Sequence, residues 1–452
     1  MTECSQSSFG FGRHFSRAVV GRFDGGQMTS DAGALMLRQT DRRMNLLSRL
    51  AACFRDGRSP WLIQHTVPEM VAQRIYGLAL GYEDLSDHDQ LRQDPLFGVL
   101  SGKPQAGEKA LAGKSTLNRL ELSTAQPSRY KKIHYQQEQM DELLVAVFLE
   151  AHARAPERIV LDLDVTDLAL HGHQEGRFFH GYYDSYCYLP LYIFAGEQLL
   201  CARLRTADQD ASAGSQAEVE RIVTQIRKQW PKVEIIVRAD SGFCREELLK
   251  WCEANSVSYV IGMARNERLR RTIEPQMQEA ARQHAQTGKP ARVFTEFDYQ
   301  TTSGSWSRAR RIVSKCEQIE GKENPRYVVT NLSPEQWPAQ PLYEELYCQR
   351  GDMENRIKEQ FSLFAGRVSA ETISANQLRL YFSAMAYVLL EGVRRLGLKG
   401  TEMAHAQVAT IRLRLLKIGA QIRITARKIW VAMASSYPYQ LLFQHAYQQL
   451  LA

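Results

Sequence analysis

The most informative stretch of the sequence, residues 347–360, places four polar side chains on one face of a predicted helix. These side chains, separated by three, four and four residues, are Tyr347, Arg350, Glu354 and Lys358. At about 100° per residue they fall within an arc of roughly 80°. One carboxylate beside a tyrosine and two cations suits a site that binds phosphate groups. The alternative is a ladder of ion pairs along an ordinary surface helix.

Two further carboxylates lie in a predicted buried strand, residues 158–168. Asp162 and Asp164 are two residues apart, so they share one face of that strand. Carboxylates in an apolar strand are unfavourable unless a cation or hydrogen bonds compensate them. A bound metal ion is one such cation.

A third acidic position follows the apolar strand 233–239 and precedes a turn and a helix. Open α/β sheets bind their ligands at this point, where a strand ends and a helix begins. Asp240 is therefore a candidate site residue. The alternative is that its carboxylate only caps the helix that follows.

Two aspartates and a glutamate from two strands and a late helix predict a three-carboxylate metal site. Mg²⁺ prefers hard oxygen ligands of this kind. Two such ions about 3.5–4 Å apart activate a water on one side of a phosphodiester and stabilise the leaving oxygen on the other. The pattern alone leaves open whether Asp162 or Asp164 is the first acid.

The motifs that carry these acids resemble those of DDE transposases of bacterial insertion sequences, in particular insertion-sequence family 1380. The resemblance covers most of the chain. The matching stretches are DGGQMTSDAG, LGYEDLSDHDQLRQDP, LAGKSTLNRLE, LDLDVTD, HGHQEGRFFHGYY, RADSGF and YCQRGDMENRIKE. It implies an enzyme that cleaves the ends of its element and joins the 3′-hydroxyl to target DNA by two-metal-ion chemistry.

The resemblance also implies roles for individual residues. It assigns the metals, two Mg²⁺ ions that Mn²⁺ can replace, to Asp164, Asp240 and Glu354. The family's Asp-x-Thr pattern favours Asp164, followed here by Val and Thr, over its rival Asp162.

A wider transposase pattern, Tyr-x2-Arg-x3-Glu-x6-Lys, matches at Tyr347, Arg350 and Glu354, which are expected to form the phosphate-binding face. Its lysine position is Phe361 here. Lys358, one turn earlier on the same face, is therefore the candidate for the missing phosphate contact.

The elements that must position these residues predict an α/β fold: an RNase H-like mixed sheet with helices. A β-rich insertion is expected before the last catalytic helix, and a helical domain at the N-terminus. The expected domains are 1–154 (mostly helical, DNA-end-binding), 155–375 (catalytic, interrupted at about 266–335) and 376–452 (basic, helical). Helices are expected at 60–79, 115–122, 130–153, 215–230 and 244–254, and strands at 158–168, 186–195, 198–206, 233–239 and 257–263.

Charge and composition are consistent with a DNA partner. The net charge is +7, and residues 379–428 hold ten Lys or Arg against two acids, an excess of 10 − 2 = +8. Such a surface favours phosphate contacts, although a solvated helix surface is the alternative. Four candidates for backbone contact in the N-terminal domain are Lys114, Arg119, Lys131 and Lys132. The expected partners are double-stranded DNA (terminal inverted repeats and target) and a second copy in a homodimer.

Other patterns exclude some classes of protein. No apolar run reaches the roughly 18 residues of a membrane span, so a cytoplasmic, nucleoid-associated enzyme is expected, with no membrane partner. The eight cysteines include no Cys-x-x-Cys pair, which argues against a zinc finger or a disulfide framework. Gly113-Lys114-Ser115 lacks the spacing of a P-loop.

Several readings remain open. The set His171, His173 and His180 is a weak zinc signal and fits loop ordering or DNA contact better. Trp306 and Trp337 fit core positions better than base stacking. The alternative functions are a metal-dependent nuclease without strand joining, a retained transposase that only binds DNA, and a protein whose acids are purely structural.

Overall fold

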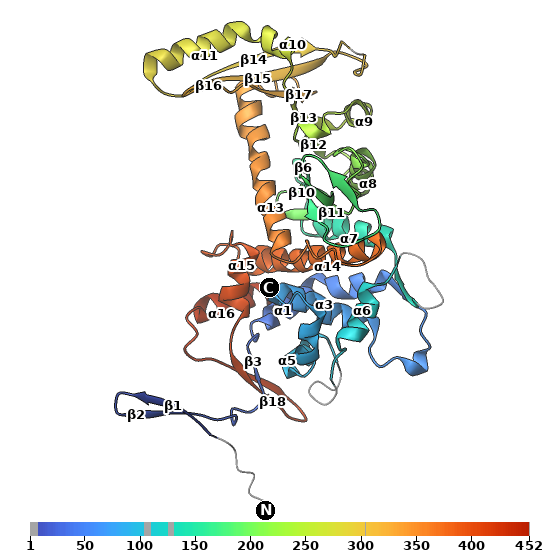
Figure 1. The fold of residues 1–452 in the computed structure, drawn as a ribbon, viewed down its shortest axis with the longest axis vertical. Helices are drawn as coiled ribbons and strands as arrows, with labels where there is room; N and C mark the ends of the chain where they lie inside the picture. The colour runs from blue at the N-terminus through green and yellow to red at the C-terminus, as the bar shows by residue number, and fades with distance from the viewer. Residues whose placement is uncertain (1–7, 104–109, 125–130, 303, 452) are drawn as a thin grey trace, which may run out of the picture. The chain divides into compact units, whose positions relative to one another are not determined.

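The computed structural model describes residues 8–103, 110–124, 131–302 and 304–451. The chain forms two compact units. The helical unit combines residues 1–135 with 385–452, and the sheet unit is the continuous segment 136–384. The two ends of the chain therefore belong to the same unit, as the blue and red segments in Figure 1 illustrate.

The sheet unit contains a nine-stranded mixed sheet. Its order is β11-β10-β6-β12-β13-β17-β15-β14, with β16 paired to β15. The bounds are β6 Arg158–Val165, β10 Leu191–Ala195, β11 Gln198–Arg203, β12 Glu234–Ala239, β13 Ser258–Met263, β14 Ala291–Tyr299, β15 Arg310–Ile319, β16 Lys322–Glu323 and β17 Arg326–Thr330. β6 pairs parallel with β12 and antiparallel with β10, so the strand that carries Asp162 and Asp164 lies inside the sheet.

Helices cover both faces of this sheet (Figure 1). One face holds α7 (Gln137–Glu150), α8 (Ser215–Gln229) and α9 (Glu246–Ala254), whose apolar residues form the main core with the strands. The other face holds a continuous helical run of α12 (Ala339–Pro341), η4 (Leu342–Tyr347), η5 (Cys348–Arg350) and α13 (Gly351–Phe361). Leu342, Tyr343 and Leu346 of η4 pack on strand residues such as Ile236 and Val260.

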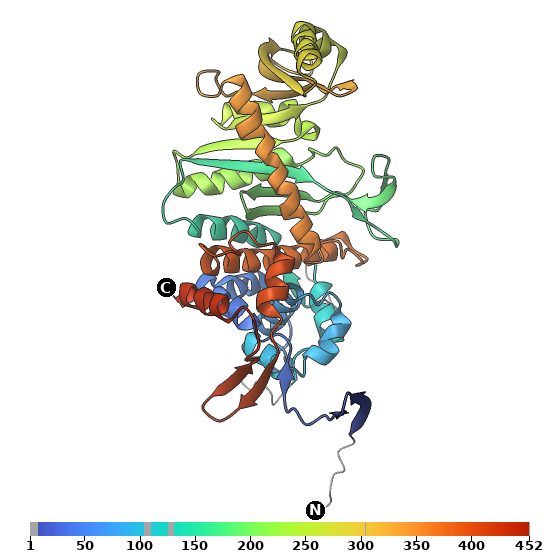
Figure 2. The same cartoon turned by 90° about the vertical axis from the view of Figure 1, so that its left-hand side faces the viewer.

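The region predicted as a β-rich insertion extends the same sheet. β17 pairs antiparallel with β13, and β15 and β14 continue outward from it. Two helices, α10 (Glu267–Thr272) and α11 (Glu274–Thr287), precede these strands, and α11 packs on β14 and β15 (Figure 2). A small separate sheet has the order β7-β9-β8, with bounds Leu168–Ala169, Ser185–Tyr188 and Phe178–His180.

In its described residues, the helical unit is built from short helices and three small sheets. Its helices are α1 Ala34–Met44, α2 Leu46–Ala52, η1 Pro60–Leu62, α3 Val67–Leu80, η2 Leu85–Asp87, α4 His88–Leu91, α5 Pro95–Leu100, α6 Lys114–Glu121, η6 Val393–Gly397, α15 Val408–Ile411, η7 Arg412–Leu416 and α16 Gln440–Leu451. α14 (Ile373–Gly392) begins in the sheet unit and ends here. The strands are β1 Phe9–His14, β2 Arg17–Gly21, β3 Met28–Thr29, β4 Phe54–Asp56, β5 Ile133–Tyr135, β18 Ala420–Ile424 and β19 Ile429–Met433.

Two predicted helix starts in residues 60–153 are wrong. The helix expected from residue 60 begins at Val67, because Thr66 and Glu69 form a capping box and Pro68 occupies the first turn. The helix expected from residue 130 begins at Gln137, after the short strand β5. Among the described residues, none of the helices combines the length and apolar character needed to cross a membrane.

Candidate active site

Asp162 is held by a neighbouring strand. Its Cα lies opposite that of Arg238 in the parallel β6–β12 register. Arg238 Nε donates to Asp162 Oδ1 at 2.5 Å and Nη2 donates to Oδ2 at 2.7 Å. Both side chains are almost fully buried, and Arg238 Nη1 also donates to the carbonyl of Leu346 in the helical run. The pair therefore links β6, β12 and the helix on the opposite side of the sheet from α8.

Asp164 lies two residues further along β6 and faces a different environment. Its Oδ1 accepts from the Val165 amide at 2.9 Å, and its Oδ2 lies 3.3 Å from Arg350 Nη1. Burial, above all, raises the pKa of Asp164 to about 6. The Arg350 guanidinium opposes that rise, whereas the carboxylates of Asp240 and Glu354 add to it. Asp240 and Glu354 are therefore both close enough to Asp164 to influence its pKa.

Asp240 follows the last residue of β12. Its Oδ1 accepts from the Gly242 amide at 2.9 Å and so caps the short turn η3 (Ser241–Phe243). Asp240 therefore caps this turn with one carboxylate oxygen. It does not cap α9, the helix considered from the sequence, which begins after Arg245 and has no side-chain cap. The parallel pairing of Ala239 with Leu163 explains why the next residue of each strand, Asp240 and Asp164, come near each other.

The helical run that carries the other candidates is not one regular helix. Between the α-helical α12 and α13, η4 is wound as a π-helix and η5 as a 3₁₀-helix. The expected even spacing of 100° per residue is therefore wrong between Tyr347 and Arg350. The change of winding occurs beside Leu346, whose carbonyl accepts the side chain of Arg238. Such departures from α-helical winding are frequent at functional sites.

Arg350 is the common neighbour of the acids. Its Nη1 lies 3.3 Å from Asp164, and its Nη2 lies 3.6 Å from Glu354 Oε1. Burial opposes its charge, but its four neighbours raise the pKa of Arg350; they are Asp164, Tyr347, Asp240 and Glu354. Glu354 is 55% exposed, and Lys358 is exposed one turn further along α13. The structure thus gathers every predicted residue except Lys358 around one guanidinium.

Tyr347 lies against β13, the strand next to β12, and Asp240 directly follows β12. A Cβ atom added to Gly262 of β13 would lie 2.6 Å from the Tyr347 hydroxyl and 2.9 Å from the Ser241 amide nitrogen. Burial raises the pKa of Tyr347, with Arg350 acting against the shift and Asp240 adding to it. The bare backbone of Gly262 therefore allows the tyrosine and the Asp240 turn to approach each other.

A Gly262→Ala substitution is expected to disturb this approach. The added methyl group must displace the Tyr347 hydroxyl or the Ser241 backbone, at a cost of about 1–3 kcal/mol. Urea unfolding should show that loss, together with slower DNA cleavage. Gly351→Ala is the matched control, because it adds the same methyl group to a helix in open space. Equal stability of both variants would contradict the close contact.

The donor set suits a divalent cation, although the acids do not form a ready cage. Within the described part of the chain, no three His, Cys, Asp or Glu side chains are arranged so that they could hold a metal ion. Asp164, Asp240 and Glu354 nevertheless supply only carboxylate oxygens, the ligands that Mg²⁺ prefers. Burial disfavours the negative charge of Asp164 and is the largest cause of its raised pKa, which the Arg350 guanidinium offsets only in part. A bound cation would stabilise that charge.

The three predicted histidines follow β6 in the small sheet region. His173 contacts Arg177 at 3.3 Å, and His180 packs against Tyr183 with ring centroids 5.1 Å apart. Tyr183 and Val165 both pack against a small buried cluster of Cys187, Leu189 and Ala207. Burial, Asp167 and Asp164 raise the pKa of Tyr183 to about 12, so this tyrosine lies near the first acid. From the sequence, the neighbouring histidines were candidate site residues and Tyr183 was not.

Several basic candidates have structural contacts. Lys114 pairs with Asp89 at 3.1 Å, so Asp89 holds the start of α6. His88 is fully buried and contacts Gln73. In residues 379–428, Lys417 pairs with Asp31 and Arg412 donates to the carbonyl of Ala79. The exposed cations of that region are Lys399, Arg414, Arg423, Arg427 and Lys428. Part of the predicted basic surface is therefore internal structure.

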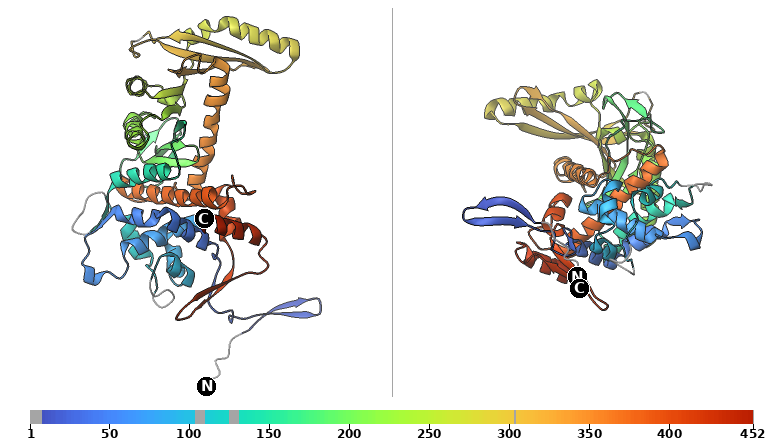
Figure 3. Two further views of the ribbon diagram at one scale, coloured as in Figure 1. Left: turned by 180° about the vertical axis from the view of Figure 1, so that it is seen from behind. Right: turned by 60° about the horizontal axis from the view of Figure 1, so that its bottom comes forward.

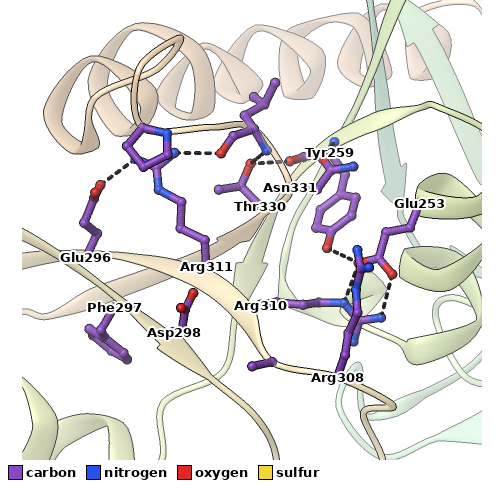
Figure 4. Close-up of a pocket in the computed structure, with 13 residues that line it drawn as sticks. Glu253, Tyr259, Glu296, Phe297, Asp298, Arg308, Arg310, Arg311, Thr330 and Asn331 are labelled. Carbon is purple, nitrogen blue, oxygen red and sulfur yellow. Dashed lines mark hydrogen bonds and ion pairs between the residues drawn. The ribbon is translucent and has the colours of Figure 1, made fainter.

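A pocket of about 500 Å³ in the sheet unit lies elsewhere (Figure 4). Most of its charged side chains are already paired: Arg310 and Arg308 contact Glu253, and Arg311 contacts Glu296. Trp306, beside Arg310, is 4% exposed, which confirms a core position rather than a stacking surface. None of the predicted site residues lines this pocket.

Comparison with known proteins bears on these observations. The sequence model of a family described as "Transposase DDE domain group 1" matches residues 11–452. No curated protein sequence matches the chain. Among solved structures, the chain is similar to a piggyBac transposase in a synaptic complex with hairpin DNA. That similarity has 10% identity and a TM-score of 0.43 and covers 85% of this chain and 79% of that chain. From the family match across almost its whole length, the chain belongs to the DDE transposases and is a DDE-type transposase enzyme.

Proposed function

We propose that this transposase cleaves the ends of its own mobile element and joins the resulting 3′-hydroxyl to target DNA. The observation that carries the proposal is the convergence of three acids from separate elements. Asp164 from β6 and Glu354 from α13 lie 3.3 and 3.6 Å from the guanidinium of the partly buried Arg350, and Asp240 after β12 also influences the pKa of this arginine. A partly buried arginine among three carboxylates marks a place where negative and positive charge must balance.

Asp164, Asp240 and Glu354 would hold two Mg²⁺ ions, or Mn²⁺ in their place. When bound, such ions supply activation of the attacking oxygen and stabilisation of the leaving oxygen. The side chains have further tasks. We expect the guanidinium of Arg350 to contact a DNA phosphate and the hydroxyl of Tyr347 to donate a hydrogen bond to the same phosphate. The exposed Lys358 would contact the DNA backbone nearby.

Asp164 is the better first acid than Asp162. Both oxygens of Asp162 accept hydrogen bonds from Arg238 inside the sheet. Asp164 keeps only one contact with a cation, and its pKa responds to the other two acids. The geometry therefore supports separate roles for the two aspartates: Asp162 holds the scaffold and Asp164 binds the metal.

The strand arrangement supports an RNase H-like core. β6 is flanked by the antiparallel β10 and β11 on one side and by the parallel β12 and β13 on the other. We further propose membership of insertion-sequence family 1380, on the motifs quoted above. Binding of double-stranded DNA by residues 1–154 and assembly as a homodimer are proposals as well, since two element ends must be brought together.

The first experiment compares the parent protein with Glu354→Gln on DNA that carries the gene's flanking repeats, with Mg²⁺. We expect nicks with 3′-hydroxyl ends at the repeat boundary from the parent and none from the variant. Glu345→Gln is the matched control, because it removes an exposed acid from the same helical run.

The outcomes separate the candidate functions. Nicks followed by strand joining support the transposase, whereas nicks alone indicate a nuclease. Binding of the repeats without nicks by either protein indicates a DNA-binding role only. Equal cleavage by the parent and Glu354→Gln would exclude Glu354 from the site.

A further inference from the structure

The first two strands form a ribbon that stands apart from the rest of the helical unit (Figure 3). β1 and β2 pair only with each other, and every residue of both strands except Gly21 is exposed. An isolated two-stranded ribbon is only marginally stable in water. Such a ribbon is expected to gain stability by contacting a partner.

The charge of the ribbon favours an anionic partner. Residues 8–23 contain Arg13, Arg17 and Arg22 and no acid. All three arginines are exposed. This is the charge pattern of a segment that contacts phosphates.

The turn at the tip carries an unexpected residue. Phe15 has a φ of 53°, in the left-handed region where Gly or Asn is the usual choice, and its side chain is 87% exposed. The turn therefore keeps a large aromatic ring in water on a strained backbone. Strain of this kind at an exposed position indicates a functional reason for the residue.

The other aromatic residues stiffen the ribbon. The rings of Phe9 and Phe23 meet edge to face with centroids 5.7 Å apart. Phe11 covers Gly21, since its ring would lie 2.9 Å from a Cβ added there. These contacts leave the tip, from Arg13 to Arg17, as the part that extends furthest from any support within the ribbon.

We propose that the β1–β2 ribbon is an arm that enters the minor groove of duplex DNA, with Phe15 as a wedge against a base step and arginines on the flanking phosphates. Strands are narrow enough to enter a groove, and apolar wedges flanked by cations unstack base steps and bend the duplex. This inference rests on the proposed function, because it describes one way in which the transposase would bind DNA. Nothing in the ribbon requires the metal site.

The first test uses Phe15→Gly in the full-length protein. Glycine suits the positive φ, so the substitution relieves strain and should not lower the melting temperature. The probe is a mixed-sequence duplex with fluorophores at both ends, free of any flanking repeat. We expect the parent to bend it by roughly 20–90°. Phe15→Gly should abolish the bend and weaken binding about tenfold or more, while Phe15→Trp should keep both.

The second test measures phosphate contacts through salt. Arg17→Gln and Arg22→Gln should each reduce the slope of log K against log[salt] by about 0.9, the value for one phosphate contact. The matched control is Arg271→Gln, which removes an arginine that is 80% exposed in the sheet unit, and its slope should equal the parent's.

Each contrary outcome is distinct. If Phe15→Gly bends the duplex and binds it as the parent does, the proposal that the ribbon is a DNA-binding arm is wrong. A fall in oligomer mass at unchanged DNA affinity identifies the ribbon as a contact between copies of the chain and also overturns it. If the parent cleaves in a Glu354-dependent manner while all arm variants bind normally, only this inference fails. If the parent binds no duplex at all, the proposed function fails with it.

Discussion

An Asp164→Asn protein is expected to lose DNA cleavage and, at neutral pH, to become more stable than its parent. Cleavage should fall by at least about 10³-fold, since the proposed metal site loses one of its three carboxylate ligands. Stability should rise because Asp164 is ionised against its environment. Its pKa in the folded protein is about 6, above the ordinary value of 3.8, and burial is the largest cause.

The sign of the effect follows from proton binding. Between pH 4 and 6 the folded protein keeps a proton on Asp164 that the unfolded chain has lost, so the parent loses stability as pH rises through this window. Asparagine carries no such charge. The advantage of the variant should therefore be absent near pH 3.5, grow to pH 6 and then level off, at about 1–3 kcal/mol.

Urea unfolding at several pH values measures this advantage, and Mn²⁺ provides a second readout. Ligand binding to the folded state alone raises the melting temperature, so Mn²⁺ should stabilise the parent and leave Asp164→Asn unchanged. Asp298→Asn is the control, because this exposed acid lies on β14 at the far edge of the same sheet. A variant that cleaves at the parental rate would refute the assignment of Asp164.

Much of the sheet was predictable because its signals are local. The alternation of apolar strands and amphipathic helices from residue 215 to 263 predicts α8, β12, α9 and β13 to within two residues of their observed ends. The position of Asp240 at the end of a strand follows from the same pattern. Its approach to Asp164 then needs only the parallel pairing of two strands.

What the sequence could not predict depends on contacts between distant residues. Arg238 is an ordinary-looking strand residue, and only the register of β6 and β12 shows that it neutralises Asp162. The π-helical winding of η4 likewise has no local sequence signal that periodicity would detect. A useful signal was present: an arginine within a buried strand, on the same face as a nearby acid, requires a buried partner.

Replacing Arg238 is expected to cause a second large effect, a loss of stability. Arg238→Met should lower the free energy of unfolding by about 3–5 kcal/mol, because it leaves the buried carboxylate of Asp162 without its cation. The Leu346 carbonyl would lose a donor as well. Since Leu346 precedes Tyr347 in the run that leads to Arg350 and Glu354, cleavage should slow together with the loss of stability.

Arg292→Met is the matched control in the same sheet. Arg292 pairs with Glu317 but is 52% exposed, so the same substitution there should change stability by less than about 1 kcal/mol. Urea unfolding of both variants tests the contrast. A similar loss of stability at the two positions would mean that the Arg238–Asp162 pair does not specifically stabilise the sheet.

The double variant Arg238→Met/Asp162→Leu decides between the two aspartates. Replacing a whole buried ion pair by apolar residues of similar size is often neutral, so much of the lost stability should return. If Asp162 only supports the sheet, cleavage should return in part with the fold, because Asp164, Asp240 and Glu354 are intact. If the refolded double variant is stable yet completely inactive, Asp162 is the first acid and Asp164 is not.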